Sequence, residues 1–435
     1  MNQDSRSRLL VKNVFASFVF KGWSAVVVLL MVPLTLKMLG IYHNGIWLTI
    51  SGILLWIDMF DIGLGNGLRN EVARSIAAGD TPRVRQAVSS TLFMLTIVVL
   101  PLFLLLFTVI CFFDMNAALG DTSLRVSNMD TILVVAVAMS CATFVLKSVG
   151  NFYMGMQLPA VNNLVTSLGY TVAFLLTYAA YLYGYRSLLV VAVINTVSPL
   201  LIWLACMLYT FLYKYPQYRP SARNVNLRMS RSLCSTGVLF FILQVCSVIL
   251  FTSTNIIISQ AFSPAEVTPY QIAYRYFSLM LVAFNIICLP FWNATTDAYA
   301  RKDMKWIVFT GRRLNRLLML IFAGLLLMVL LSDHVYRLWV GAEVQIPIGL
   351  SASMALYIFI LIVSMRYSYI LNGINVLRIQ LVFTVSAVVV FIPLAWVVCR
   401  YYGTVTSLVL TMCLINLPGL IANRWKYNQL FHTRP

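Results

Sequence analysis

Apolar runs of about 20 residues recur along the whole chain, and each is long enough to cross a bilayer as one helix. The alternation of apolar and polar residues that marks membrane-spanning strands is almost absent. Hydrophobic residues make up 61% of the 435 residues and charged residues only 10%, which is more apolar surface than a soluble domain needs. We therefore predict an all-α integral membrane protein.

The apolar runs predict twelve transmembrane helices. Their approximate bounds are 14–39, 44–66, 88–112, 131–154, 162–184, 188–213, 232–260, 267–291, 305–331, 347–371, 376–399 and 404–424. The longest connections, at about 113–130 and 214–231, are too short for an additional folded domain. The first run follows basic residues but lacks a small-residue cleavage site, so we interpret it as a first span and not as a signal peptide.

The chain carries an excess of basic residues, 31 Lys and Arg against 13 Asp and Glu, for a formal charge of +18. These residues cluster before the first span and after spans two, six, eight and twelve, which all fall on one side of the membrane. Basic residues gather in cytoplasmic loops, where they also attract anionic lipid headgroups. We therefore predict that both termini are cytoplasmic. We also predict that the basic residues orient the chain and contact anionic lipids, and that they do not bind a nucleic acid.

The chain divides most clearly in its middle, at the polar segment 214–231. This segment is basic, contains Pro216 and Pro220, and leaves six predicted spans on either side. We therefore predict an N-terminal six-helix lobe at 1–213, a cytoplasmic linker at 214–231, and a C-terminal six-helix lobe at 232–435 that ends in a short cytoplasmic tail.

The two predicted lobes show a sparse internal repeat. Asp80 aligns with Asp303 at an offset of 223 residues, and a second match places Gly155 opposite Gly373. Because each lobe has an even number of spans, we expect the lobes to share one orientation and to be related by an axis along the membrane normal. Transporters built from such parallel repeats bind their substrate between the halves.

Six ionisable residues fall inside the predicted spans, where charge is costly and usually functional. They are Lys21, Asp58, Asp61, Lys147, Arg275 and Arg366. Lys21 lies about 10 Å from the cytoplasmic end of its helix at 1.5 Å per residue, and both acids reach a similar depth on one face of the next helix. In one interpretation Lys21 pairs with Asp58 or Asp61 and only locks two helices together. In the other, Asp58 or Asp61 couples transport to protons or sodium ions.

Three of the cations have no acid in their own predicted spans. For Lys147, Arg275 and Arg366 we predict a water-filled cavity that receives an anionic ligand. Lys147 and Arg366 also align within one position in the repeat. The alternative for these two is that their side chains extend to the cytoplasmic interface, an explanation that suits Arg275 less well.

The segment Asp58–Asp80 combines the two acids with three alternate glycines, Gly63, Gly65 and Gly67. A dinucleotide-binding loop would need a preceding strand and a different glycine spacing, and a phosphate-binding loop would need a lysine that is absent here. We therefore predict that the glycines permit close helix contact or a bend where the second span leaves the membrane.

The polar residues after these glycines are predicted to form one half of a cytoplasmic gate, and the equivalent segment 281–303 of the second lobe is predicted to form the other half. The gate residues are Arg69, Asn70, Arg74, Asn293 and Asp297. Because Asp297 takes the place of Arg74 in the repeat, the two halves would differ in charge. For the arginines, anchoring of the topology is the alternative.

No residue pattern indicates catalysis or a bound cofactor. The eight cysteines lack a CxxC pair and mostly lie in apolar runs, as small buried hydrophobic residues do. The three histidines are far apart in the sequence. We therefore expect no enzyme, no metal site and no cofactor other than a coupling ion.

The sequence from Leu39 to Asp80, LGIYHNGIWLTISGILLWIDMFDIGLGNGLRNEVARSIAAGD, resembles the early spans of bacterial polysaccharide transporters. These are the O-antigen (Wzx-type) lipid-linked oligosaccharide flippases of the multidrug/oligosaccharidyl-lipid/polysaccharide exporter (MATE-like) superfamily. The Gly-Ile-Trp after the first span and the Asp-x-Gly-x-Gly-Asn-Gly-x-Arg-Asn exit of the second span carry most of the resemblance. The layout of six plus six spans extends it over the chain.

The resemblance implies a V-shaped, MATE-like fold of twelve helices around a cationic cavity. It implies that an undecaprenyl-pyrophosphate-linked oligosaccharide moves from the cytoplasmic to the periplasmic leaflet of the bacterial inner membrane by alternating access. Lys21, Lys147, Arg275 and Arg366 would line the cavity, because a pyrophosphate needs ammonium or guanidinium partners. The implied partners are the lipid-linked oligosaccharide and other membrane proteins of polysaccharide assembly.

Two other functions stay open. A cation-coupled multidrug exporter of the same superfamily would need acids in its cavity, and only Asp58 and Asp61 are available. A membrane glycan polymerase or ligase would need sizeable periplasmic loops with catalytic arginines or histidines, and the predicted outer loops are short.

Overall fold

The computed structural model of the protein describes residues 3–61, 63–122, 125–226, 229, 238–374, 376 and 378–431. Within these ranges the chain is almost entirely helical and contains no strand. Ten helices of the described part are long and apolar enough to cross a membrane. The prediction of an all-α membrane protein is confirmed.

The chain forms two compact units, Met1–Phe241 and Ile242–Pro435. The first unit contains α1 (Gln3–Leu54), α2 (Leu64–Ala77), α3 (Thr81–Phe112), α4 (Met115–Ala118), α5 (Met129–Leu146), α6 (Ser148–Gly155), α7 (Pro159–Leu182) and α8 (Leu188–Leu208). α10 (Val238–Ala261) begins at the end of this unit, and most of its residues belong to the second unit. The first unit also contains the short 3₁₀ helices η1 (Ile57–Asp61), η3 (Pro216–Tyr218) and η4 (Ala222–Asn224), and a π-helical segment η2 (Tyr209–Lys214). The second unit contains α11 (Pro264–Ala300), α12 (Met304–Val340), α13 (Ile348–Gly373), α14 (Arg378–Tyr402) and α15 (Val405–Phe431). The predicted lobe boundaries stay a prediction, and part of the predicted linker lies outside the described residues.

Every one of the twelve predicted spans overlaps a helix, but two of them are broken. α1 covers the first span and the start of the second, with a bend at Gly40 between them, where φ is +71°, a value that glycine adopts at little cost. The second span, predicted as one helix, is interrupted by η1 before it continues as α2. The fourth span is likewise divided into α5 and α6, with Lys147 between them.

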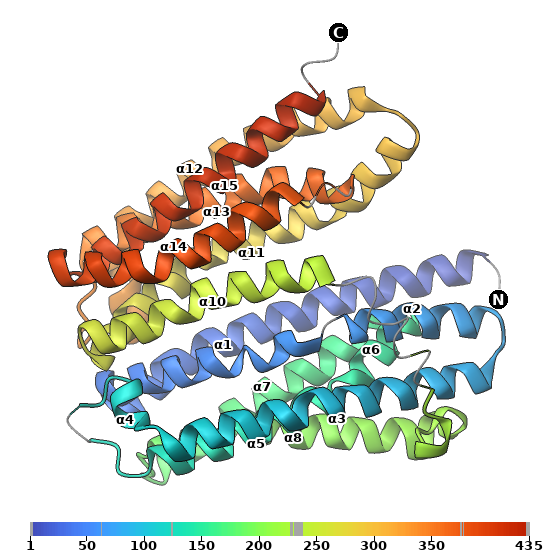
Figure 1. Ribbon diagram of the computed structural model, residues 1–435, viewed down its shortest axis with the longest axis horizontal. Coiled ribbons are helices and arrows are strands. Elements are labelled where there is room, and N and C mark those ends of the chain that lie inside the picture. The colour runs from blue at the N-terminus through green and yellow to red at the C-terminus, as the bar shows by residue number, and fades with distance from the viewer. Residues whose placement is uncertain are drawn as a thin grey trace. The chain divides into compact units, whose positions relative to one another are not determined.

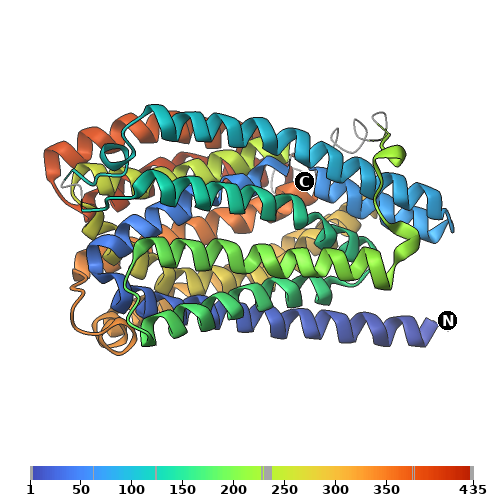
Figure 2. The same cartoon turned by 90° about the horizontal axis from the view of Figure 1, so that it is seen from below.

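The long helices of the N-terminal unit run alongside one another (Figures 1 and 2). α1 packs on α7, α5 and α7 pack on α8, α3 packs on α5, and α2 packs on both α3 and α6. Fully buried side chains such as Ile46 and Ile50 of α1 and Val191 of α8 fill the core between them. Leu104 and Leu105 of α3 are more than half exposed, as expected of side chains that face lipid.

The C-terminal unit is organised around α13. This helix packs against α11, α12 and α15, and α14 packs against α15. Met354, Ile358 and Ile362 of α13 are all 0% exposed. Their spacing of four residues places them on one face of the helix, which explains why α13 forms the centre of the unit.

The turn between α2 and α3 has the same construction as the turn between α11 and α12. Oδ1 of Asp80 accepts a hydrogen bond from the backbone N–H of Arg83, at 3.0 Å, in the first turn of α3. Oδ1 of Asp303 accepts one from the N–H of Trp306, also at 3.0 Å, in the first turn of α12. An acid at this position satisfies a helix N–H that has no partner within the helix. The two aspartates that align in the predicted repeat therefore have the same role, and the repeat as a whole stays a prediction.

The segment that follows η2 is held against α3. Oγ of Ser89 accepts a hydrogen bond from the N–H of Ser221 at 3.0 Å. Oγ of Ser90 accepts one from the N–H of Asn226 at 2.8 Å. Tyr215 packs among aromatic side chains of the same unit, and its partial burial raises the pKa of its hydroxyl. The described part of the predicted linker is thus packed onto the N-terminal unit.

Candidate functional site

The two broken helices of the N-terminal unit meet at one ion pair. Asp58 lies in η1, between α1 and α2, and Lys147 lies between α5 and α6. Nζ of Lys147 is 2.8 Å and 2.9 Å from the two carboxylate oxygens of Asp58. The Lys147 side chain is 40% exposed and that of Asp58 is 38% exposed. An accessible charge pair at interrupted membrane helices is a candidate binding site, because such breaks are where transporters place ligand contacts.

The second acid, Asp61, accepts a hydrogen bond from the backbone. Its Oδ1 accepts a hydrogen bond from the N–H of Gly65 at 2.7 Å, at the start of α2, where the helix dipole stabilises a negative charge. Lys21 is exposed on α1 and forms no ion pair with either acid within the described ranges. The predicted pairing of Lys21 is therefore wrong. Asp58 is paired with Lys147 instead, because η1 packs against α5.

The glycines of this segment bring α2 and α6 close together. A Cβ atom at Gly65 would overlap the side-chain amide of Asn151 on α6, and a Cβ atom at Gly155 would lie 2.7 Å from the carbonyl oxygen of Arg69 on α2. Gly63 has a φ of +81° just before α2 begins, which favours glycine. Of the two predicted alternatives, close helix contact is seen at Gly65, and a turn lies at Gly63, where α2 begins.

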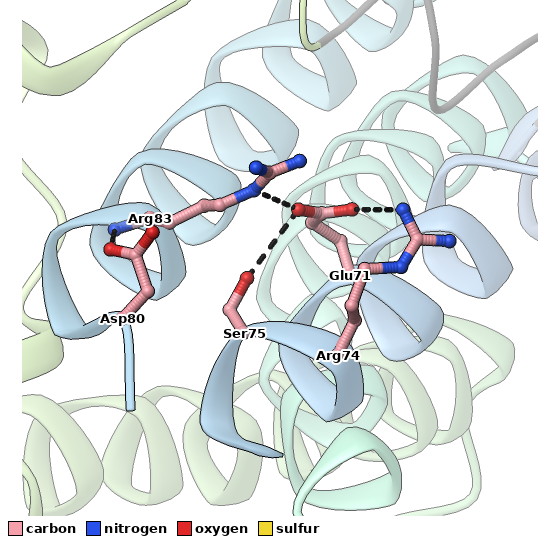
Figure 3. Close-up of polar contacts among 5 residues, drawn as sticks. All are labelled: Glu71, Arg74, Ser75, Asp80 and Arg83. Atoms are coloured by element: carbon pink, nitrogen blue, oxygen red, sulfur yellow. Dashed lines mark hydrogen bonds and ion pairs between the residues drawn. The ribbon is translucent and has the colours of Figure 1, made fainter. Parts of the chain in front are cut away.

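A buried carboxylate on α2, Glu71, was not among the predicted site residues. It is 8% exposed and accepts hydrogen bonds from Nε of Arg83, from Oγ of Ser75 at 3.4 Å and from Nη1 of Arg74 at 3.5 Å (Figure 3). Arg74 is largely exposed, so its ion pair adds little stability. Arg83 instead joins the start of α3 to α2. The only sequence signal was a single acid among several arginines.

Arg366, the repeat counterpart of Lys147, is enclosed within the C-terminal unit. It is 3% exposed, and its Nη2 donates a hydrogen bond to the carbonyl of Gly311 at 3.0 Å. Its guanidinium carbon lies 4.2 Å from the ring centre of Tyr367 and 5.0 Å from that of Tyr427, distances at which aromatic rings attract cations. Arg366 is thus enclosed by side chains and backbone of α12, α13 and α15, and its predicted role as a cavity cation stays a prediction.

The other predicted residues keep the status of predictions. Arg275 is half-buried on α11, and its guanidinium forms no ion pair with any described residue. Arg69 and Asn70 are exposed on α2. Asp297 forms an exposed ion pair within α11, and the side chain of Asn293 lies outside what the structure describes. The gate that these residues would form is untested.

Comparison with known proteins shows the family of this chain. The model of a family described as polysaccharide biosynthesis protein matches residues 10–289, which is well over half of the chain. The chain belongs to this family. A Salmonella typhi relative, assigned as an O-antigen transporter, is 23% identical over 411 residues. The alignment covers 90% of this chain and 89% of the relative.

Solved structures show which fold this chain adopts. An inward-facing multidrug resistance MATE family transporter of the MOP superfamily matches with a TM-score of 0.75 and 16% identity, over 96% of both chains. An outward-facing transporter of the same description matches with a TM-score of 0.61 and 17% identity, over 96% of this chain and 97% of that one. The predicted MATE-like fold is confirmed.

Proposed function

We propose that this polysaccharide biosynthesis protein is a flippase that moves a lipid-linked oligosaccharide from the cytoplasmic to the periplasmic leaflet of the bacterial inner membrane. The family and the O-antigen transporter relative support the substrate class. The observation that carries the proposal is the accessible pair of Asp58 and Lys147 at two broken helices. It offers a cation within the membrane whose present partner can be exchanged for a substrate anion.

The pyrophosphate of an undecaprenyl-linked oligosaccharide would compete with Asp58 for Lys147. A pyrophosphate carries more negative charge than a carboxylate and more oxygens that accept charge-assisted hydrogen bonds. Transfer of Lys147 to the substrate would leave the Asp58 carboxylate without its partner, and a proton or sodium ion could then neutralise it. The exchange would couple substrate binding to ion uptake without an unpaired charge in the membrane.

A cation-coupled multidrug exporter is the second candidate, because the structural neighbours are transporters of that kind. At 16% and 17% identity these neighbours show the fold alone. An exporter of cationic drugs would need an available acid, but Asp58 is held by Lys147 and Asp61 by the N–H of Gly65. The arrangement of charges therefore favours an anionic substrate. The Salmonella typhi relative is named as a transporter, which favours transport over glycan polymerisation.

Reconstitution of the purified chain tests the flippase proposal. Proteoliposomes that contain a fluorescent undecaprenyl-pyrophosphate-linked oligosaccharide are expected to expose the glycan of the inner leaflet to an added glycosidase. Liposomes without protein, and proteoliposomes with a phosphatidylcholine probe in place of the substrate, are the controls. If exposure of the glycan does not depend on the protein, or if the chain exports cationic drugs instead, the proposal fails.

We further propose that both termini and the predicted linker face the cytoplasm, because the basic residues concentrate there. In intact cells, a single cysteine placed at Arg223 in a cysteine-free chain should react only with a membrane-permeant maleimide. A cysteine placed at Arg186, on the opposite side in the proposed topology, should react with an impermeant maleimide as well. The reverse labelling pattern would contradict the orientation.

A further inference from the structure

Three connections at one end of the N-terminal unit enclose a pocket that the proposed flippase mechanism does not use. It lies at the bend of α1, the start of α5 and the start of α8, at the end that carries α4 in Figure 1. Its volume is about 190 Å³, which is room for roughly six water molecules. The polar side chains that line it include His43, Arg125, Asn128, Arg186 and Ser187.

Arg125 is held in place by its neighbours. Its guanidinium carbon lies 4.5 Å from the ring centre of Tyr42, and the hydroxyl of Tyr42 donates a hydrogen bond to Asp121 at 2.7 Å. Asp121 is 0% exposed and also accepts hydrogen bonds from the backbone N–H groups of Arg125 and Val126, at 3.1 Å and 2.9 Å. The arginine is thus positioned before any ligand arrives, which lowers the entropy lost on binding.

The starts of two long helices add positive potential to the pocket. Asn128 precedes α5 and Ser187 precedes α8, and neither side chain accepts a hydrogen bond from its helix. The first N–H groups of both helices are therefore without the usual side-chain acceptor. Together with the helix dipoles, such groups favour an anion.

The acids near the pocket lie outside its lining, including Asp121, which accepts a hydrogen bond from the N–H of Arg125. None of the described residues that line it is an aspartate or a glutamate. Arg125 and Arg186 form no ion pair within the described ranges. Asp130 is exposed in the first turn of α5 but is not among the lining residues. The described lining of the pocket therefore combines two arginines and two helix starts without a carboxylate.

We propose that this pocket binds a phosphate group. Arginine matches the geometry of phosphate oxygens through paired hydrogen bonds, and both helix starts present further donors. The pocket lies at the ends of membrane-spanning helices, where lipid headgroups are found. The phosphate can belong to a lipid headgroup or to a free ion, and the site exists whether or not the chain is a flippase.

Amide hydrogen exchange of the purified full chain tests the site directly. In discs of phosphate-free galactolipid, inorganic phosphate at constant ionic strength should slow exchange at residues 129–131 and 188–190 at least about threefold, because a bound anion protects these N–H groups. A chain with both Arg125→Gln and Arg186→Gln should show no such protection. Arg400→Gln removes an exposed arginine at the end of α14 and should leave the protection unchanged.

The outcomes separate the two sources of phosphate. Protection by the free ion supports a site open to soluble phosphate. Protection only when phosphatidylglycerol is added to the discs assigns the site to a lipid headgroup. Protection by neither probe, or equal protection in the double variant, overturns the proposal. Should the double variant not fold, Arg186→Gln alone changes only an exposed side chain and should still weaken the protection.

Discussion

A chain in which Lys147 is replaced by glutamine is expected to lose transport of the lipid-linked oligosaccharide by at least about tenfold, whereas Asp58→Asn should keep most of it. Hydrogen bonds to a charged group contribute about 1.5–3 kcal/mol, and 1.4 kcal/mol corresponds to a factor of ten. The Lys147→Gln variant would lose this contribution to the binding of the pyrophosphate. Asp58 only holds the cation before the substrate arrives, so its loss should not weaken the substrate contact.

Initial rates in proteoliposomes without an ion gradient measure both variants. Arg337→Gln is the matched control, because it breaks a comparable but well-exposed ion pair with Asp333 on α12 and should not change the rate. A purely structural pair makes a different prediction. Both single variants would then lose transport equally, and the double variant, which leaves no unpaired charge, would regain it.

The positions of the membrane spans could be predicted from sequence because the requirement is local. A helix needs about 20 apolar residues to cross the bilayer, and every predicted span overlaps a helix of the structure. The turn at Asp80 and Asp303 was also predictable, because each acid acts on the helix that follows it. The break at η1 was not, since the two acids within it did not show that the helix stops there. Gly63 indicated a bend without showing where the helix stops.

The partner of Asp58 could not be found from depth alone. Counting residues along each helix placed Lys21 and Asp58 at similar heights, but it did not give the direction in which either side chain points. Lys147 lies 89 residues further along the chain than Asp58, and the two meet because η1 packs on α5. Helix rotation and packing decide such a contact, and a single sequence does not specify them.

The internal sequence repeat was likewise limited in what it could predict. Lys147 and Arg366 align in sequence, yet Lys147 stays accessible while Arg366 is buried. The difference comes from residues elsewhere in the chain. Gly311 offers its carbonyl and Tyr427 its ring to Arg366, whereas Lys147 meets an acid. An alignment of the two halves therefore identified equivalent positions but not equivalent surroundings.

The contact between α2 and α6 gives the second large expected effect. Gly155→Ala should destabilise the protein, because the added Cβ would lie 2.7 Å from the backbone oxygen of Arg69 and 2.8 Å from Cβ of Val72. A backbone atom cannot rotate away, and overpacking of this kind costs about 1–3 kcal/mol. Gly65 and Gly155 both place α2 against α6, the helix that begins beside Lys147, so separating the two helices should also slow transport.

Gly22→Ala is the matched control for this substitution. Gly22 also lies in a helix, but a Cβ atom there would have nothing within 4 Å, and alanine favours helix over glycine by about 0.5–1 kcal/mol. Thermal unfolding in detergent should therefore show a midpoint lowered by several degrees for Gly155→Ala, at about 2–4 °C per kcal/mol for a unit of this size. The unfolding midpoint of Gly22→Ala should equal that of the unsubstituted chain or lie slightly above it. Equal midpoints for the two variants would mean that α2 and α6 are not in the close contact on which the position of Lys147 depends.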